Sequence, residues 1–143
     1  MIKVESSVVI NKPPAEVYAF VSSGEHTTEW QGGVTSVENE GPPNVVGSRY
    51  TETRKFLGQE MKTTLEIIVV EPNAKWASKV VKGPVPYEVI VTFEASGAGT
   101  KMTTKVEGEP TGFFKIAEGM VSSQLEKSLA EDGQRLKALL EGK

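Results

Sequence analysis

The residues best placed to do chemistry in this sequence are Glu52 and Arg54, two positions apart in the segment Val46–Phe56. Side chains at i and i+2 of a strand share a face, so a strand here would set the carboxylate beside the guanidinium. That face would also carry Tyr50 and Phe56, the larger apolar groups, and it is the better candidate to point inward. Buried charges are costly unless paired, and these two could pair with each other or with a polar ligand group. The alternative is a twisted edge region in which both faces stay in water.

An inward Glu52 held in place by Arg54 could act as a general base, and Tyr50 and Tyr87 are further groups available for acid–base chemistry. His26 is the only side chain whose ordinary pKa lies near neutrality. Its place in a short helix with neighbouring glutamates is typical of an exposed residue. No nucleophile, base and orienting residue form a recognisable set, so the catalytic residues stay open, with Glu52 and Arg54 as candidates.

Composition excludes several classes of function. The 16 basic and 19 acidic residues give a net charge of −3 and form no basic block, which argues against nucleic-acid binding. There is no cysteine, and with one histidine and one aspartate a metal site is not expected, nor is any cofactor. No apolar run is long enough to span a membrane and no hydrophobic signal region opens the chain, so we predict a cytoplasmic protein without integral membrane contact. Nothing indicates an oligomeric state.

The chain's periodicity predicts seven strands, two short helices and one long helix. The first strand, Ile2–Ile10, alternates apolar and polar residues, and two short helices follow, one beginning at Pro14 and one carrying Trp30. Six more strands are predicted at Val34–Glu40, Val46–Phe56, Met61–Glu71, Trp76–Lys82, Tyr87–Ala95 and Thr100–Glu109. Their short connections, rich in Gly, Pro and Asn, indicate an antiparallel meander, because parallel pairing needs long crossovers.

The long helix is predicted from Thr111, a candidate cap, to Glu141. Apolar residues recur along it in steps of three and four, which places them on one stripe. We expect its C-terminal half, from Leu125, to pack as a leucine stripe, and its N-terminal half to form a pocket wall. Gly119 in that half could allow a bend. A chain of 143 residues fits a single domain of class α+β, in which a strongly curved seven-stranded sheet wraps around this helix.

The whole chain resembles the START-like, helix-grip superfamily, also called SRPBCC, and within it the branch of polyketide cyclases/dehydrases and lipid transport proteins. The matching pieces, in order, are VVINKPPAEVYAFV, Trp30, GPPNVVGSRY, the hairpin at Gly58, EPNAKW, GAGT and LAEDGQRLKALLE. The resemblance implies a helix-grip fold and a cavity between sheet and long helix for a hydrophobic or amphipathic small molecule.

We therefore predict a single START-like ligand-binding domain over residues 1–143. Apolar walls with a few orienting polar groups are typical of such sites. The expected ligand-binding residues are Trp30, Tyr50, Glu52, Arg54, Met61, Leu65, Trp76, Tyr87, Val89, Phe113, Phe114, Ala117, Met120 and Val121. The alternative for the apolar ones is that they simply fill the interior.

Three functions remain open. The first is binding or carriage of a lipid-like or polyketide-like molecule, and the second is a cyclase or dehydratase reaction in the same cavity. The third is a protein-interaction role, which the fold alone suggests. Because no catalytic set is visible, the sequence favours binding over catalysis. The stretches Gly41–Gly47 and Gly83–Pro86 could act as lids, although ordinary hairpin turns have the same composition.

Overall fold

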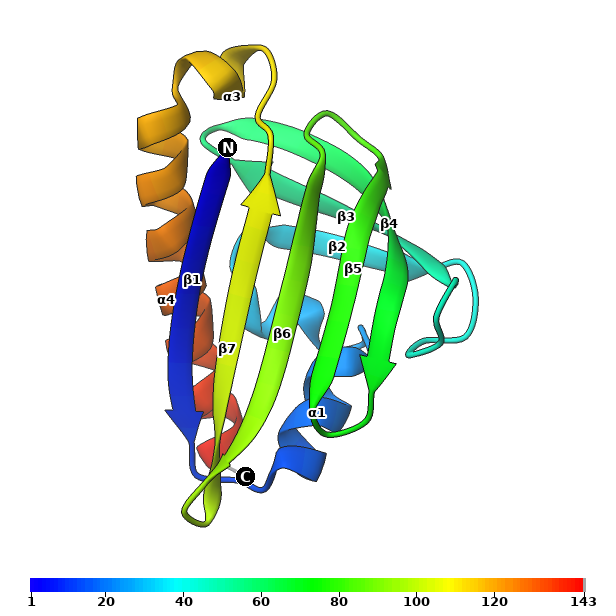
Figure 1. The fold of residues 1–143 in the computed structure, drawn as a ribbon, viewed down its shortest axis with the longest axis vertical. Helices are drawn as coiled ribbons and strands as arrows, with labels where there is room; N and C mark the ends of the chain where they lie inside the picture. Colours follow the sequence, from blue (N-terminus) through cyan, green and yellow to red (C-terminus); the bar gives the residue numbers. More distant parts are fainter. Residues whose placement is uncertain (143) are drawn as a thin grey trace.

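Seven antiparallel strands are followed by a helical region in the computed structural model, which describes residues 1–142 (Figure 1). Two short helices lie between the first strand and the second. The side chains of Phe113 and Phe114 lie outside the described residues. The elements are β1 (Ile2–Ile10), α1 (Pro14–Ser22), α2 (Thr27–Trp30), β2 (Val34–Asn39), β3 (Arg49–Phe56), β4 (Gln59–Glu71), β5 (Lys75–Lys82), β6 (Tyr87–Ser96), β7 (Gly99–Gly108), α3 (Phe113–Ile116) and α4 (Glu118–Glu141).

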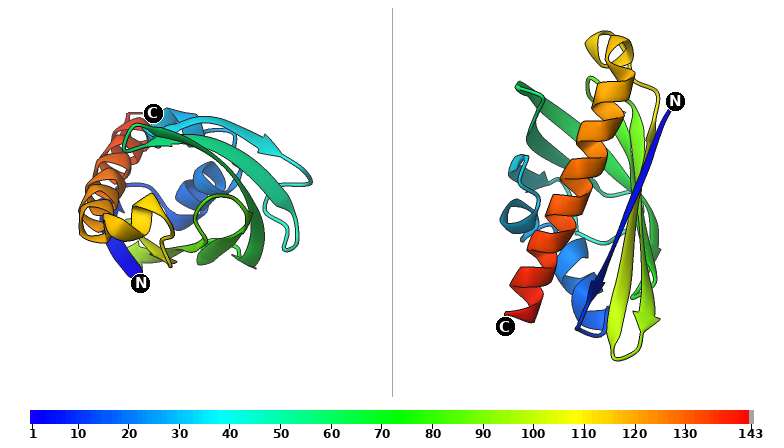
Figure 2. Two further views of the ribbon diagram at one scale, coloured as in Figure 1. Left: turned by 90° about the horizontal axis from the view of Figure 1, so that it is seen from above. Right: turned by 90° about the vertical axis from the view of Figure 1, so that its left-hand side faces the viewer.

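The strands form one sheet in the order β1-β7-β6-β5-β4-β3-β2, and every pairing is antiparallel. Register shifts occur in the β2–β3 and β4–β5 pairings, at Val34/Ser36, Thr64/Leu65 and Ile67/Val69. Such irregularities increase local twist and bend a strand, which suits a sheet that curls. Figure 2 shows the curled sheet with α4 lying along its open side, beside β1. The predicted α+β, helix-grip architecture is confirmed.

Two apolar clusters occupy the interior of the curl. We call one the lower cluster, because its elements meet at the lower end of the molecule in Figure 1. It joins α1, α2, the end of β1, the second half of β6, the beginning of β7 and the C-terminal end of α4. It is closely packed around Ile10, Val17 and Leu136, which are not exposed at all. The upper cluster joins the start of β1 with Met61, Val106 and Val121, and with half-buried residues such as Leu125 and Leu129.

The C-terminal helical region differs from the single helix predicted. Ala117, with φ −100° and ψ 27°, interrupts the helix and separates the short α3 from α4. The sequence analysis placed a possible bend at Gly119, and the structure places the interruption two residues earlier. Thr111 donates from its hydroxyl to the carbonyl of Pro84, 3.1 Å away, and α3 begins two residues later, at Phe113. The N-terminal half of the predicted helix thus includes a separate turn that crosses the upper end of the molecule (Figure 1).

Strand β3 begins three residues later than predicted. Val46 belongs instead to a turn in which the amide of Ser48 donates to the carbonyl of Val45, and Gly47 adopts a positive φ of 94°. No helix in the described residues is long and apolar enough to cross a membrane.

Candidate functional site

The inner face of the curled sheet and α4 enclose a pocket of about 180 Å³. The pocket lies between the two clusters and takes side chains from α1, α2, α4 and every strand. Most of its wall is apolar, while Glu52, Arg54 and Asp132 are the charged residues among the described ones that line it. This composition matches that of small-molecule sites, which combine apolar walls with a few placed polar groups.

Alternation along β3 delivers Tyr50, Glu52, Arg54 and Phe56 to the pocket, so the structure places the mixed apolar and charged face inward. Glu52 is 7% exposed. The alternative, in which both faces of this strand stay in water, does not fit that burial. The opposite face presents Arg49 and Lys55 to solvent.

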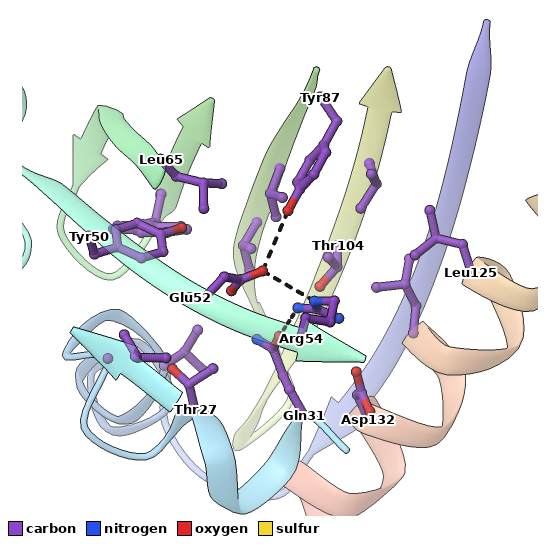
Figure 3. Close-up of a pocket in the computed structure, with 18 of the residues that line it drawn as sticks. Thr27, Gln31, Tyr50, Glu52, Arg54, Leu65, Tyr87, Thr104, Leu125 and Asp132 are labelled. Carbon is purple, nitrogen blue, oxygen red and sulfur yellow. Dashed lines mark hydrogen bonds and ion pairs between the residues drawn. The ribbon is translucent and has the colours of Figure 1, made fainter. Parts of the chain in front are cut away.

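Glu52 is the centre of a small polar cluster (Figure 3). The guanidinium Nε of Arg54 donates to Glu52 Oε1 over 3.1 Å, and the hydroxyl of Tyr87 donates to the same oxygen over 3.4 Å. Arg54 Nη2 also donates to the side-chain carbonyl of Gln31, 2.7 Å away. Three elements that are distant in sequence, α2 with its following turn, β3 and β6, therefore meet at one buried carboxylate.

Burial sets the ionisation of the phenols near this carboxylate. Burial and, next, the charge of Glu52 raise the pKa of Tyr87, and the same two causes raise the pKa of Tyr50. Both phenols are consequently neutral and able to donate. Tyr50 shares a 2.8 Å hydrogen bond with Ser78, a residue with no exposure. For Arg54, burial alone would lower the pKa, but Glu52 and Tyr87 outweigh it and the pKa is raised, which keeps the guanidinium charged.

Asp132, on α4, forms a second polar cluster at the pocket wall (Figure 3). Its Oδ1 accepts from the backbone amide of Gly32 and from Arg135 Nη1, each at 3.1 Å. Arg135 Nη1 also donates to the carbonyl of Trp30 over 2.8 Å, so the cluster ties α4 to α2. Burial raises the pKa of Asp132, and the Gly32 amide, Arg54 and Arg135 offset only part of that rise.

Most residues predicted from the sequence to bind a ligand do lie in the wall of the pocket. These are Trp30, Tyr50, Glu52, Arg54, Met61, Leu65, Trp76, Tyr87, Val89 and Val121. The indole N–H groups of Trp30 and Trp76 are buried and have no hydrogen-bond partner in the described part of the chain.

The predictions for the start of the long helix are partly wrong. Met120 is 55% exposed, because the inward line of α4 runs through Val121 and Leu125 and residue 120 is turned about 100° away. Ala117 is half-buried against the upper cluster but is not in the pocket wall. Phe113 and Phe114, also predicted to line the pocket, have side chains outside the described residues.

Sequence reasoning missed several lining residues, among them Gln31, Leu125, Leu129 and Asp132. Leu125 and Leu129 had been expected to serve packing only. Asp132 could have been found, because it stands in the apolar stripe of α4 between Leu129 and Leu136, where a charge is unusual. Gln31 carries no such signal, since it lies in the turn after α2.

His26 lies away from the pocket wall. Its ring stacks on Phe20 at a centroid distance of 4.1 Å and its Nδ1 is 2.5 Å from Glu29 Oε2. The sequence led us to expect an exposed histidine, but with 34% side-chain exposure His26 is half-buried. The described residues contain no group of three or more side chains suited to hold a metal ion.

The two predicted lid segments both border the pocket, through Pro43 and Val85. Hydrogen bonds tie both segments to other elements, and in the first of them the amide of Gly47 donates to the carbonyl of Ile67 on β4 over 2.9 Å. The hydroxyl of Tyr18 donates to Asn44 Oδ1 over 2.6 Å, and Thr111 holds the carbonyl of Pro84 as described above.

A curled antiparallel sheet, a long C-terminal helix and a pocket between them define a START/polyketide cyclase-like ligand-binding fold. The family model described as polyketide cyclase/dehydrase and lipid transport matches residues 1–141. The chain belongs to this family. No curated protein gives a significant match.

Solved structures of the same fold share little sequence with this chain. A protein from Thermus thermophilus superposes with a TM-score of 0.77 at 19% identity, covering 96% of this chain and 98% of its own. A START superfamily protein from Mycobacterium smegmatis gives 0.70 at 16% identity, covering 97% and 99%. A protein of the dynemicin biosynthetic locus gives 0.68 at 18% identity, covering 99% of this chain and 48% of its own. At such identities the likeness concerns the fold alone.

Proposed function

We propose that residues 1–143 act as one domain that binds or carries a hydrophobic or aromatic small molecule in the pocket between sheet and α4. The observation that supports this most is the contrast within the wall, where an apolar surface surrounds the buried cluster of Glu52, Arg54, Tyr87 and Gln31. Such a cluster is costly to bury for packing alone, whereas it would orient a bound molecule. Cytoplasmic location stays a prediction from the sequence.

The test is native mass spectrometry of freshly purified protein, followed by solvent extraction and identification of any retained compound. The expected result is an adduct that is lost on denaturation and recovered as an apolar or aromatic molecule. Val89→Phe serves as the control, because its larger ring would occupy the pocket. An adduct of equal abundance in that variant, or retention of only polar buffer components, would contradict binding in this pocket.

A second candidate is a cyclase or dehydratase reaction on a polyketide-like substrate, supported by the position of Glu52. There it would take an α proton from a poly-β-carbonyl chain, while Arg54 stabilises the enolate oxygen. Glu52→Gln and Arg54→Met should each lower turnover by at least about 100-fold, as judged from typical losses of general-base and oxyanion contacts. Unchanged rates of aromatic product formation in both variants, with the fold intact, would exclude these roles. The protein-interaction hypothesis stays a prediction.

A further inference from the structure

Only one of the two carboxylate oxygens of Glu52 accepts hydrogen bonds from the described residues. Both of its hydrogen bonds, from Arg54 and Tyr87, go to Oε1. Among the described residues Oε2 has no hydrogen-bond partner. The side-chain atoms of these residues that are both fully buried and unpaired are the indole nitrogens of Trp30 and Trp76, so Oε2 is not fully buried. This carboxylate oxygen is therefore an acceptor open to the pocket.

Two further donors belong to the same polar cluster as this acceptor. Arg54 donates through Nε and Nη2, which leaves Nη1 without a partner in the residues that the structure describes. Gln31 accepts through its carbonyl oxygen, so its amide Nε2 is unpaired within the same set. Figure 3 shows the Glu52, Arg54 and Gln31 side chains converging from β3 and from the turn after α2. The pocket thus presents an unpaired acceptor and unpaired donors within one polar cluster.

The charges in the pocket wall are already matched. Glu52 pairs with Arg54, and Asp132 pairs with Arg135, whose side chain is 43% exposed and reaches solvent. An anionic ligand would add a negative charge beside Glu52 and Asp132, and a cationic ligand would add a positive charge beside Arg54. Either charge would be buried without a partner of its own, which is strongly unfavourable. A neutral hydroxyl can instead donate to Glu52 Oε2 and accept from Arg54 or Gln31.

We propose that the pocket selects a small, uncharged, ring-containing alcohol or phenol, whose hydroxyl binds between Glu52 Oε2 and the free donors of Arg54 and Gln31. This inference rests on the proposed binding function and adds the ligand's charge, polar group and size to it. The volume of about 180 Å³ lies below the roughly 300–1,000 Å³ of sites for drug-sized molecules, which favours a ligand of one or two rings over a long lipid chain.

The test is isothermal titration calorimetry of the unmodified protein at pH 7 with four probes that share a naphthalene ring. 2-Naphthol is neutral and donates, 2-methoxynaphthalene is neutral and cannot donate, 2-naphthoate is an anion and 2-naphthylmethylamine is a cation. We expect 2-naphthol to bind at least about tenfold more tightly than each of the others, as a hydrogen bond to a charged group would give.

Equal affinity for 2-naphthol and its methyl ether would overturn the role of the hydroxyl, and tighter binding of either ion would overturn the requirement for neutrality. In both cases the binding function would survive. Failure of all four probes to bind would overturn this inference, while the native mass spectrometry experiment would still decide the proposed binding function.

Glu52→Gln gives an independent check, because it keeps the side chain's shape and removes its charge. The lone cation of Arg54 should then favour the anion, so the affinity ratio of 2-naphthoate to 2-naphthol should rise at least about tenfold. Glu66→Gln is the matched control, since it removes a carboxylate of the neighbouring strand β4 that pairs with Arg49 outside the pocket. An unchanged ratio in a folded Glu52→Gln protein would contradict the proposal. Should that variant not fold, the four-probe series on the unmodified protein decides alone.

Discussion

The Glu52–Arg54 pair combines a cost in stability with a use in recognition. Placing two charged groups in an apolar interior is rarely the most stabilising choice, since apolar side chains of similar volume often do as well or better. The pair persists here on a strand whose other inward residues are aromatic, and its second oxygen is open to the pocket. At the scale of single residues, we therefore interpret it as part of a binding site and not as a stabilising device.

Removing one partner of this pair should be more harmful than removing both. Arg54→Met leaves Glu52 as an unmatched buried charge and should lower the free energy of unfolding by about 3 kcal/mol. Adding Glu52→Gln should restore a good part of that loss, giving a coupling energy of about 1–3 kcal/mol. Urea denaturation followed by tryptophan fluorescence measures all four proteins of the cycle. Additive effects would mean that the two side chains do not interact.

Asp132 should make stability depend on pH in a direction opposite to that of most paired carboxylates. Because its pKa is raised in the folded protein, folding favours the protonated form, and this contribution is fully present below its ordinary value of 3.8. The contribution is lost as pH rises from there through the raised folded pKa. Asp132→Asn, which keeps the acceptor for the Gly32 amide, removes the titration.

The measurement for Asp132 is the difference in melting temperature between the natural protein and Asp132→Asn across this pH range. The natural protein should lose stability relative to the variant as pH increases. A difference that stays flat, or that changes in the opposite direction, would show that the pKa of Asp132 is not raised in the folded state.

Helix α4 serves two purposes along one face. Val121, Leu125, Leu129 and Asp132 line the pocket, whereas Leu136 and Leu140 pack in the lower cluster with almost no exposure. The division lies about three turns further along the helix than the sequence suggested. The interruption at Ala117 separates this helix from α3, so the helical periodicity of α4 does not extend to the residues before Ala117.

Matched truncations on α4 test this assignment of faces. Leu136→Ala should cost about 2–5 kcal/mol, because it opens a cavity in a fully buried site. Met120→Ala should change stability by no more than about 0.5 kcal/mol, because its side chain is largely in water. Chemical denaturation of both variants gives the comparison. A loss above about 1 kcal/mol at Met120 would restore the original expectation that it lies inside.

The whole molecule is organised as a packed end and an open end. The lower cluster closes the curl of the sheet with α1, α2 and the end of α4. The pocket lies between it and the upper cluster, which includes half-buried residues such as Leu125 and Leu129. This polarity lets one small domain hold a stable core and an unfilled site at the same time.

Two equal enlargements should distinguish the two ends. Val17→Phe adds a ring in the packed end, where Val17 has no exposure, and overpacking should cost about 1–3 kcal/mol. Val89→Phe adds the same ring in the pocket wall, where space exists, and should change stability by less than about 1 kcal/mol while blocking ligand retention. Thermal unfolding of both proteins provides the measurement. Similar losses would indicate that no usable space lies beside Val89.

Local periodicity predicted the strands, the two short helices and the antiparallel meander, and it made the face of Tyr50, Glu52, Arg54 and Phe56 the better inward candidate, which the burial of Glu52 then decided. Alternation and turn chemistry act over a few residues, so these features need no knowledge of distant contacts. The tertiary structure alone decided where the long helix breaks, that Met120 faces water, and that Gln31, Leu125, Leu129 and Asp132 join the pocket. Those outcomes depend on how α4 is rotated against the sheet and on contacts such as Gly32 with Asp132, 100 positions apart. No pattern within one segment encodes such a contact.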